Sequence, residues 1–209
     1  MSAPVISVDT STDFLVAGRM IIGTSIWVLD RHQDIRGSFT EFYSTSWGQF
    51  RPAAQWSVVA SRPGVLRGMH FHRRHDEGFL LVSGCAFVGL RDVRPGSPTE
   101  GISSLFEFSG NRMALLTLPR GIVHGWLFTK ESIHLQSVSE TFGEYSEDDN
   151  LGCHWSDPAL DIPWPAKPTL LAARAEGFGS LDSLLQDTLR IDPHFCYQAN
   201  RNELKPSGS

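Results

Sequence analysis

The chain has 209 residues, a formal net charge of −5, 41% hydrophobic residues and 20% charged residues. Such a composition is typical of a globular protein with a sizeable core, most simply one domain, and excludes disordered and fibrous classes. The sequence is acidic overall and has no stripe of basic residues of the kind that nucleic-acid-binding proteins carry. No stretch reaches the roughly 18 apolar residues of a membrane span and no signal-peptide pattern is visible, so we expect a cytoplasmic protein without a membrane partner.

Short apolar runs separated by turn residues indicate an all-β domain. In chain order, strands are expected at residues 25–29, 39–44, 55–60, 65–72, 78–82, 86–93, 104–108, 113–118, 125–129 and 133–139. Pairs such as Pro63-Gly64 and Pro95-Gly96 provide the turns between them. Because the strands are many and few helical crossovers connect them, the pattern predicts an antiparallel jelly-roll barrel, the double-stranded β-helix.

A short helical segment is expected only near the C-terminus, where Ser180 is a plausible N-cap and leucines recur on one helical face. The expected organisation is an N-terminal extension over residues 1–24, a barrel domain with the helical segment over residues 25–190, and a tail over residues 191–209.

Four potential metal ligands lie at a spacing that suits a β-barrel: His70, His72, Glu77 and His124. Residues i and i+2 of a strand face the same side, so His70 and His72 project together. A tight turn can return the Glu77 carboxylate beside them, and His124 arrives from a later strand. Three imidazoles and one carboxylate suit a divalent transition metal, namely Fe, Mn, Ni, Co or Zn.

The spacing around these residues resembles the first motif of the cupin superfamily at every defined position: Gly64, five residues, His70-x-His72, four residues, Glu77, six residues, Gly84. The second motif is matched in part, through Pro119-x-Gly121-x-x-His124. The alternative is a cavity in which the histidines do acid–base work without metal and Arg67 or Arg73 compensates Glu77. The remaining histidines are expected to be ordinary polar residues: His32, His75, His134, His154 and His194.

Several segments resemble the dTDP-4-dehydrorhamnose 3,5-epimerase family, which is itself a cupin family. They are Val-Leu-Arg-Gly-Met-His-Phe at residues 65–71, Leu-Pro-Arg-Gly-Ile-Val-His-Gly at 118–125, the Trp-Ser-Asp-Pro segment at 155–165 and the Asp-Ile-Arg-Gly-Ser-Phe segment at 34–39. The resemblance covers roughly residues 25–185. It implies a homodimer that binds a dTDP-4-keto-6-deoxyhexose and exchanges protons at the carbons flanking the ketone, without metal.

The resemblance also assigns roles to individual residues. It makes His70 the catalytic base and His124 the second histidine of the pocket. It implies that the substrate-binding residues are Arg36, Glu41, Gln55, Arg67 and, as a base-stacking aromatic, Phe142.

Other family positions have changed. The family's lysine near the keto oxygen falls on Glu77 or Phe79, and its tyrosine acid falls on Gln136, which can hydrogen-bond substrate but has no usable acidity. The family's aspartate that pairs with the base falls near Arg174 in this chain. The family's glutamine two residues after the base is replaced by His72. These changes disfavour dual epimerisation through a His–Tyr pair.

Three functions remain open at this point. The leading one is a metal-dependent enzyme on the epimerase scaffold, acting on a keto sugar nucleotide or a related hydroxy-ketone. Lewis-acid enolisation would then give isomerisation, epimerisation or elimination, and Fe(II) could instead support O2 chemistry. The second is a metal-free 4-keto-6-deoxyhexose epimerase that uses His70, and the third is a non-catalytic cupin that binds a sugar nucleotide.

Overall fold

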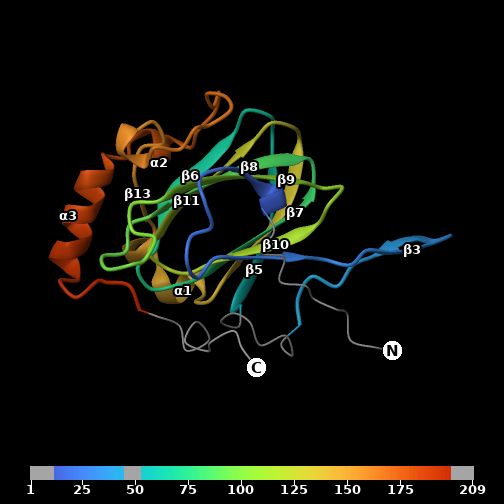
Figure 1. The fold of residues 1–209 in the computed structure, drawn as a ribbon, viewed down its shortest axis with the longest axis horizontal. Coiled ribbons are helices and arrows are strands. Elements are labelled where there is room, and N and C mark those ends of the chain that lie inside the picture. Colours follow the sequence, from blue (N-terminus) through green and yellow to red (C-terminus); the bar gives the residue numbers. More distant parts are fainter. Residues whose placement is uncertain (1–11, 45–52, 199–209) are drawn as a thin grey trace.

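The computed structural model describes residues 12–44 and 53–198, which form two antiparallel β-sheets stacked as a barrel (Figure 1). The six-stranded sheet has the order β1 (Leu15–Ala17), β9 (Ser103–Ser109), β8 (Cys85–Asp92), β11 (Ile122–Phe128), β6 (Leu66–Phe71) and β13 (Leu151–Gly152). The five-stranded sheet has the order β2 (Ser25–Val28), β10 (Ala114–Leu118), β7 (Glu77–Ser83), β12 (Ser132–Val138) and β5 (Gln55–Ser61). The predicted all-β jelly-roll class is confirmed.

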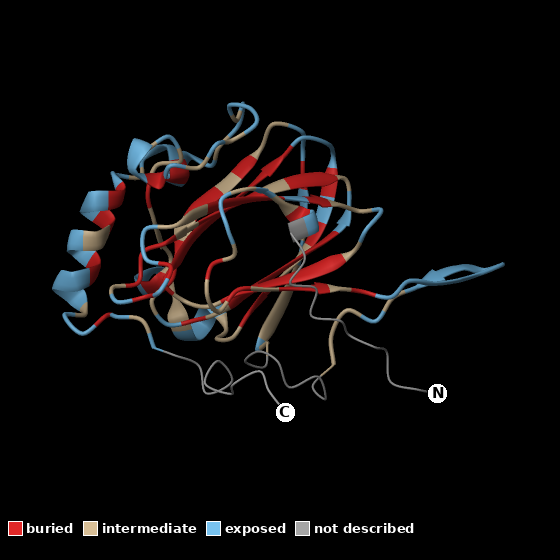
Figure 2. Ribbon diagram, in the orientation of Figure 1, coloured by how far each residue is buried: buried red, intermediate tan, exposed pale blue. Residues whose placement is uncertain are grey.

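The main core lies between the two sheets, where buried residues follow the inner faces of the strands (Figure 2). Phe79 on β7 stacks on Trp126 on β11, with ring centroids 4.7 Å apart. Side chains from opposite sheets therefore interdigitate, as in other sheet packings. Towards one end of the barrel this apolar filling gives way to histidines and a carboxylate.

A second core covers the outer face of the six-stranded sheet. Met69 and Phe71, which alternate with the inward-facing residues of β6, pack here against α3 (Leu181–Ile191). The Ser180 side chain accepts a hydrogen bond from the backbone N–H of Ser183 at 3.1 Å, so the predicted N-cap is present. Two further helices are a single turn long, α1 (Phe142–Tyr145) and α2 (Ala173–Glu176).

The structure differs from the sequence prediction at residues 39–44. Only Phe39 is in a strand, β4 (Gly37–Phe39), which pairs with β3 (His32–Asp34) in a separate hairpin. The Phe42 ring instead packs edge-on against Trp56, with centroids 5.3 Å apart. The alternating pattern of this segment thus reflects side-chain packing rather than sheet pairing.

The sheets also extend beyond the strands predicted from the sequence. β1 pairs with β9, so the six-stranded sheet begins within the region expected to be an N-terminal extension. In the region expected to be a tail, Phe195 is buried and its ring lies 5.6 Å from that of Phe71.

Within the described residues, no helix combines the length and apolarity needed to cross a membrane.

A buried carboxylate fixes the end of β8. Asp92 is fully buried and accepts hydrogen bonds from the Arg94 guanidinium at 2.8 Å, from Ser97 Oγ at 2.6 Å and from Thr99 Oγ1 at 2.7 Å. Burial alone would raise the pKa of Asp92, but these hydrogen bonds, led by Arg94, lower it below the ordinary value of 3.8. The folded state therefore favours the ionised form of Asp92.

We predict that Asp92→Ala lowers the free energy of unfolding by about 3–5 kcal/mol, because it leaves the buried Arg94 without its counter-charge. Since the pKa of Asp92 is depressed, its contribution is present above the unfolded-state pKa and is lost as the pH falls through and below it. Denaturant unfolding at pH 7 and in acid measures both effects. The exposed Asp187→Ala is the control, and an equal effect at both positions would contradict the prediction.

Candidate active site

His70 and His124 face each other across neighbouring strands. They are register partners on β6 and β11, and their ring centroids lie 5.9 Å apart. The strands approach closely beside this pair, since a Cβ on Gly68 would lie 2.7 Å from the Cα of Gly125. Gly68 also has φ +125°, a conformation that L side chains rarely adopt. Glycine at position 68 thus allows the strands to bring the two imidazoles together.

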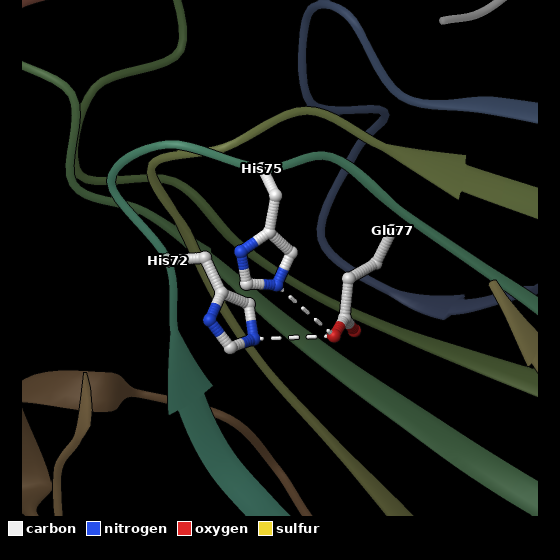
Figure 3. A group of neighbouring side chains, drawn as sticks. All are labelled: His72, His75 and Glu77. Carbon is white, nitrogen blue, oxygen red and sulfur yellow. Dashed lines mark ion pairs between the residues drawn. The ribbon is translucent and has the colours of Figure 1, made fainter. Parts of the chain in front are cut away.

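Glu77 begins β7 and places a buried carboxylate among histidines. Its Oε1 lies 3.2 Å from His72 Nε2, and its Oε2 lies 2.9 Å from His124 Nε2. Oε1 also accepts a hydrogen bond from the Gln136 amide at 3.1 Å. His75, in the turn between β6 and β7, directs Nε2 towards Oε1 at 3.8 Å (Figure 3).

Asp149 holds this arrangement from a distant part of the chain. Its fully buried carboxylate accepts hydrogen bonds from the backbone N–H groups of Arg73 at 2.7 Å and Arg74 at 3.0 Å and lies 2.9 Å from His75 Nδ1. Its backbone carbonyl oxygen lies 2.6 Å from His72 Nδ1. One residue therefore fixes both the turn that carries the histidines and the orientation of two of their rings.

The electrostatics of the site follow from burial and pairing. Burial alone would raise the pKa of Glu77, but His124 and His72 hold it well below the usual range. Burial would lower the pKa of His75, yet its hydrogen bond to Asp149, with a smaller effect of Glu77, raises it to about 9. Burial, with a smaller effect of His124, lowers the pKa of His70 to about 3. His70 is therefore neutral at physiological pH.

The structure brings together three of the four ligands expected from the sequence, since His72 and His124 both lie against the carboxylate of Glu77. The ring of His70 lies beside those of His72 and His124, with centroid distances of 6.4 and 5.9 Å. The set of donor atoms that lie within 4.8 Å of one another is instead His72, His75 and Glu77. His75, expected to be an ordinary turn residue, thus takes the place that the sequence pattern gave to His70.

The expected substrate-binding residues fall into two groups. Arg67 is half-buried and donates to Ser61 Oγ at 2.9 Å and to the Ala60 carbonyl at 3.0 Å. The Gln55 side chain accepts a hydrogen bond from the backbone N–H of Phe142 at 3.1 Å, and the Phe142 ring is exposed. Together with Gln136, these residues belong to the barrel and its immediate surroundings.

Arg36 and Glu41 are not brought to this site within the chain. Arg36 lies at the exposed turn of the β3–β4 hairpin, which projects away from the barrel, and its guanidinium pairs with Asp34 at 2.5 Å (Figure 1). Glu41 is exposed shortly after the hairpin. Sequence similarity alone had grouped both with the substrate-binding residues.

Besides His75 and Asp149, two further residues were not expected at the site from the sequence, namely His134 and Tyr145. His134 is fully buried between the rings of Phe79 and Phe128, and neither ring nitrogen has a hydrogen-bond partner among the described residues. Tyr145 stacks on His75 with centroids 4.1 Å apart. The alternation of His134 and Gln136 on one strand was the available signal, because both then face the same side.

The profile of the dTDP-4-dehydrorhamnose 3,5-epimerase family matches residues 19–182, most of the chain. The chain belongs to this family. A dTDP-4-dehydrorhamnose 3,5-epimerase of Sinorhizobium fredii is 30% identical over 151 residues, covering 68% of this chain and 76% of that protein. The spore coat polysaccharide biosynthesis protein SpsL of Bacillus subtilis is 29% identical over 147 residues, covering 69% of this chain and 97% of that protein.

Among solved structures, the 3'-monoepimerase ChmJ of Streptomyces bikiniensis in complex with dTDP-quinovose superposes with a TM-score of 0.73. It is 26% identical, and the match covers 81% of this chain and 89% of that chain. The chain is therefore a member of a family of sugar-nucleotide epimerases with the jelly-roll fold of that family.

The structure shows which contacts are made by the residues that differ from the family pattern. Phe79 is fully buried against Trp126, and the Gln136 amide is engaged by Glu77. Arg174 is exposed, donates to the Asn150 carbonyl and lies 3.7 Å from Glu147. Within the described residues, no carboxylate hydrogen-bonds to His70, so the base position lacks the orienting aspartate that the family resemblance implies.

We predict that Asp149→Asn lowers the free energy of unfolding by about 2–4 kcal/mol, since an amide cannot reproduce all of the hydrogen bonds that the carboxylate accepts. Asp148→Asn is the matched control, because the neighbouring side chain is exposed and its replacement is expected to cost less than about 0.5 kcal/mol. Denaturant unfolding of both variants measures the difference, and equal stabilities would refute the role assigned to Asp149.

Proposed function

We propose that the protein removes a proton from a carbon next to the ketone of a nucleoside-diphospho-4-keto-6-deoxyhexose, with His70 as the base. The family match carries this proposal, together with a neutral His70 paired with His124 across the two strands where the family has its catalytic histidines. The relatives are named as epimerases, which favours proton exchange over the elimination and O2 chemistry considered from the sequence. The family's nucleotide-sugar epimerases support an enzyme rather than a binding protein.

The chemistry requires one base and a means of returning the proton. A ring nitrogen of His70 takes the proton as the C–H bond breaks, and the electron pair delocalises into the ketone to form an enolate. Reprotonation at the opposite face of the carbon inverts its configuration. Because Gln136 replaces the family's tyrosine acid and pairs with Glu77, we propose that solvent returns the proton and that exchange is confined to one carbon.

Substrate binding is proposed to involve Arg67 and His134 inside the barrel and Phe142 at its rim. Arg67 has spare N–H donors beyond those used for Ser61 and Ala60, and a guanidinium suits the oxygen atoms of a diphosphate. His134 offers buried ring nitrogens without a partner among the described residues, a costly arrangement that a hydroxyl of the sugar would relieve.

We also propose that the protein is a homodimer. The β3–β4 hairpin exposes Ile35 fully and Phe39 to 64%, and an isolated two-stranded hairpin is marginally stable in water. Docking on a second copy would bury these side chains and could bring Arg36 to the partner's site. This accounts for a family-matched arginine that lies away from the barrel of its own chain.

We predict that His70→Asn slows proton exchange by at least about 100-fold, because general-base catalysis contributes on the order of 10²–10⁴. The measurement is the incorporation of deuterium from D2O into the carbons flanking the ketone of a dTDP-4-keto-6-deoxyhexose, followed by NMR. His154→Asn is the control, since the hydrogen bond of this side chain is to nearby Ser156.

Undiminished exchange in His70→Asn would refute the assignment of the base. A wild-type protein that binds the sugar nucleotide in calorimetry yet incorporates no deuterium would instead favour the non-catalytic binding module.

A further inference from the structure

Three histidines around Glu77 present the same ring nitrogen to it. The Nδ1 atom of His72 lies 2.6 Å from the Asp149 carbonyl, and that of His124 lies 2.9 Å from the Ile122 carbonyl. A carbonyl oxygen only accepts hydrogen bonds, so both Nδ1 atoms carry the hydrogen. The Nδ1 atom of His75 likewise donates to the Asp149 carboxylate.

With Nδ1 protonated, a neutral imidazole has a lone pair on Nε2. The Nε2 atoms of His72 and His124 lie 3.2 and 2.9 Å from the two oxygens of Glu77, and that of His75 lies 3.8 Å from Oε1. All three nitrogens and Glu77 Oε2 are buried without a hydrogen-bond partner among the described residues. Where these imidazoles are neutral, their lone pairs face a carboxylate in a space that water does not reach, which is unfavourable unless a proton or a metal cation lies between them.

Protons would compensate this arrangement only in part. Each oxygen of Glu77 can accept more than one hydrogen bond, and Oε1 already accepts the Gln136 amide hydrogen. Protonating every ring would gather three imidazolium groups around one carboxylate, so like charges would repel each other. A single divalent cation can instead accept several lone pairs and one carboxylate oxygen at once.

We propose that His72, His75 and Glu77 bind a divalent transition-metal ion, with His124 against the second oxygen of Glu77. The donor atoms of the first three residues lie within 4.8 Å of one another, close enough to converge on one ion after small side-chain shifts. Hydrogen bonds from ligating histidines to backbone carbonyls and carboxylates are the usual means of orienting such ligands, and Asp149 supplies both kinds here. Imidazole and carboxylate donors suit Fe, Mn, Co, Ni or Zn.

This site differs from the four-residue motif read from the sequence, because His75 replaces His70. His70 is then free to act as a base beside the ion rather than being occupied as a ligand. A cation there would polarise a keto oxygen at a site where this chain lacks the family's lysine. The binding proposal itself does not depend on which substrate the enzyme uses.

The test measures metal binding directly. Wild-type protein is stripped with a chelator and titrated with Co²⁺, followed by visible absorption and by the rise in melting temperature, and protein purified without added metal is assayed by elemental analysis. The variants are His75→Gln, Glu77→Gln and His70→Asn, with the exposed His32→Asn as a control for adventitious binding. Circular dichroism of each metal-free variant checks that it folds.

We expect about one Co²⁺ per chain in wild type, His70→Asn and His32→Asn. His75→Gln and Glu77→Gln should weaken binding by more than about 100-fold, and Asp149→Asn by about 10–100-fold through the loss of ligand orientation. If His70→Asn loses the ion while His75→Gln retains it, the four-residue motif is correct and our assignment is overturned. If wild type binds Co²⁺ no better than Glu77→Gln, there is no site.

Deuterium exchange by chelator-treated wild type separates this proposal from the proposed function. Exchange by a protein that binds no Co²⁺ would overturn the metal site and leave the epimerase proposal standing. Stoichiometric Co²⁺ binding without deuterium exchange, whichever metal is loaded, would overturn the epimerase proposal and leave the metal site standing.

Discussion

A carboxylate buried inside the barrel is the constraint on which the site depends. Glu77 is 6% exposed and stands at the start of a central strand of the five-stranded sheet, where isolation from water makes an uncompensated negative charge costly. Its surroundings are correspondingly specific, with histidine nitrogens facing both oxygens and one amide donor. This chain thus carries a buried acid at a position where one of the two alignments with the family places a lysine.

The fold holds these groups in place through contacts between distant parts of the chain. The pairing of β6 with β11 sets His70 against His124, and the turn from β6 to β7 carries His75 to Glu77. Asp149, from the segment after α1, ties down that turn through two backbone amides and a ring nitrogen. The imidazoles are thereby fixed before any ligand arrives, which is how precise sites avoid reorganisation during the reaction.

The sequence was sufficient for the fold class and for much of the site. Strand periodicity placed His70 and His72 on one face, and the return of Glu77 and the arrival of His124 followed from spacing. Asp149 could not be predicted in this way, since 74 positions separate it from His75 and only tertiary structure joins them. His75 was missed because a charged turn is ordinarily solvated, whereas here Asp149 and Tyr145 bury its ring. The strand expected at 39–44 failed because alternation cannot distinguish sheet pairing from the packing of Phe42 on Trp56.

The most direct measurement is a crystal structure of protein purified without added metal, with diffraction recorded on both sides of the absorption edge of the metal found by X-ray fluorescence. The account predicts an anomalous peak about 2.1 Å from the Nε2 atoms of His72 and His75 and beside a Glu77 oxygen, with His70 outside bonding distance. Density without an anomalous peak, or an ion bound through His70 with His75 turned away, would contradict it.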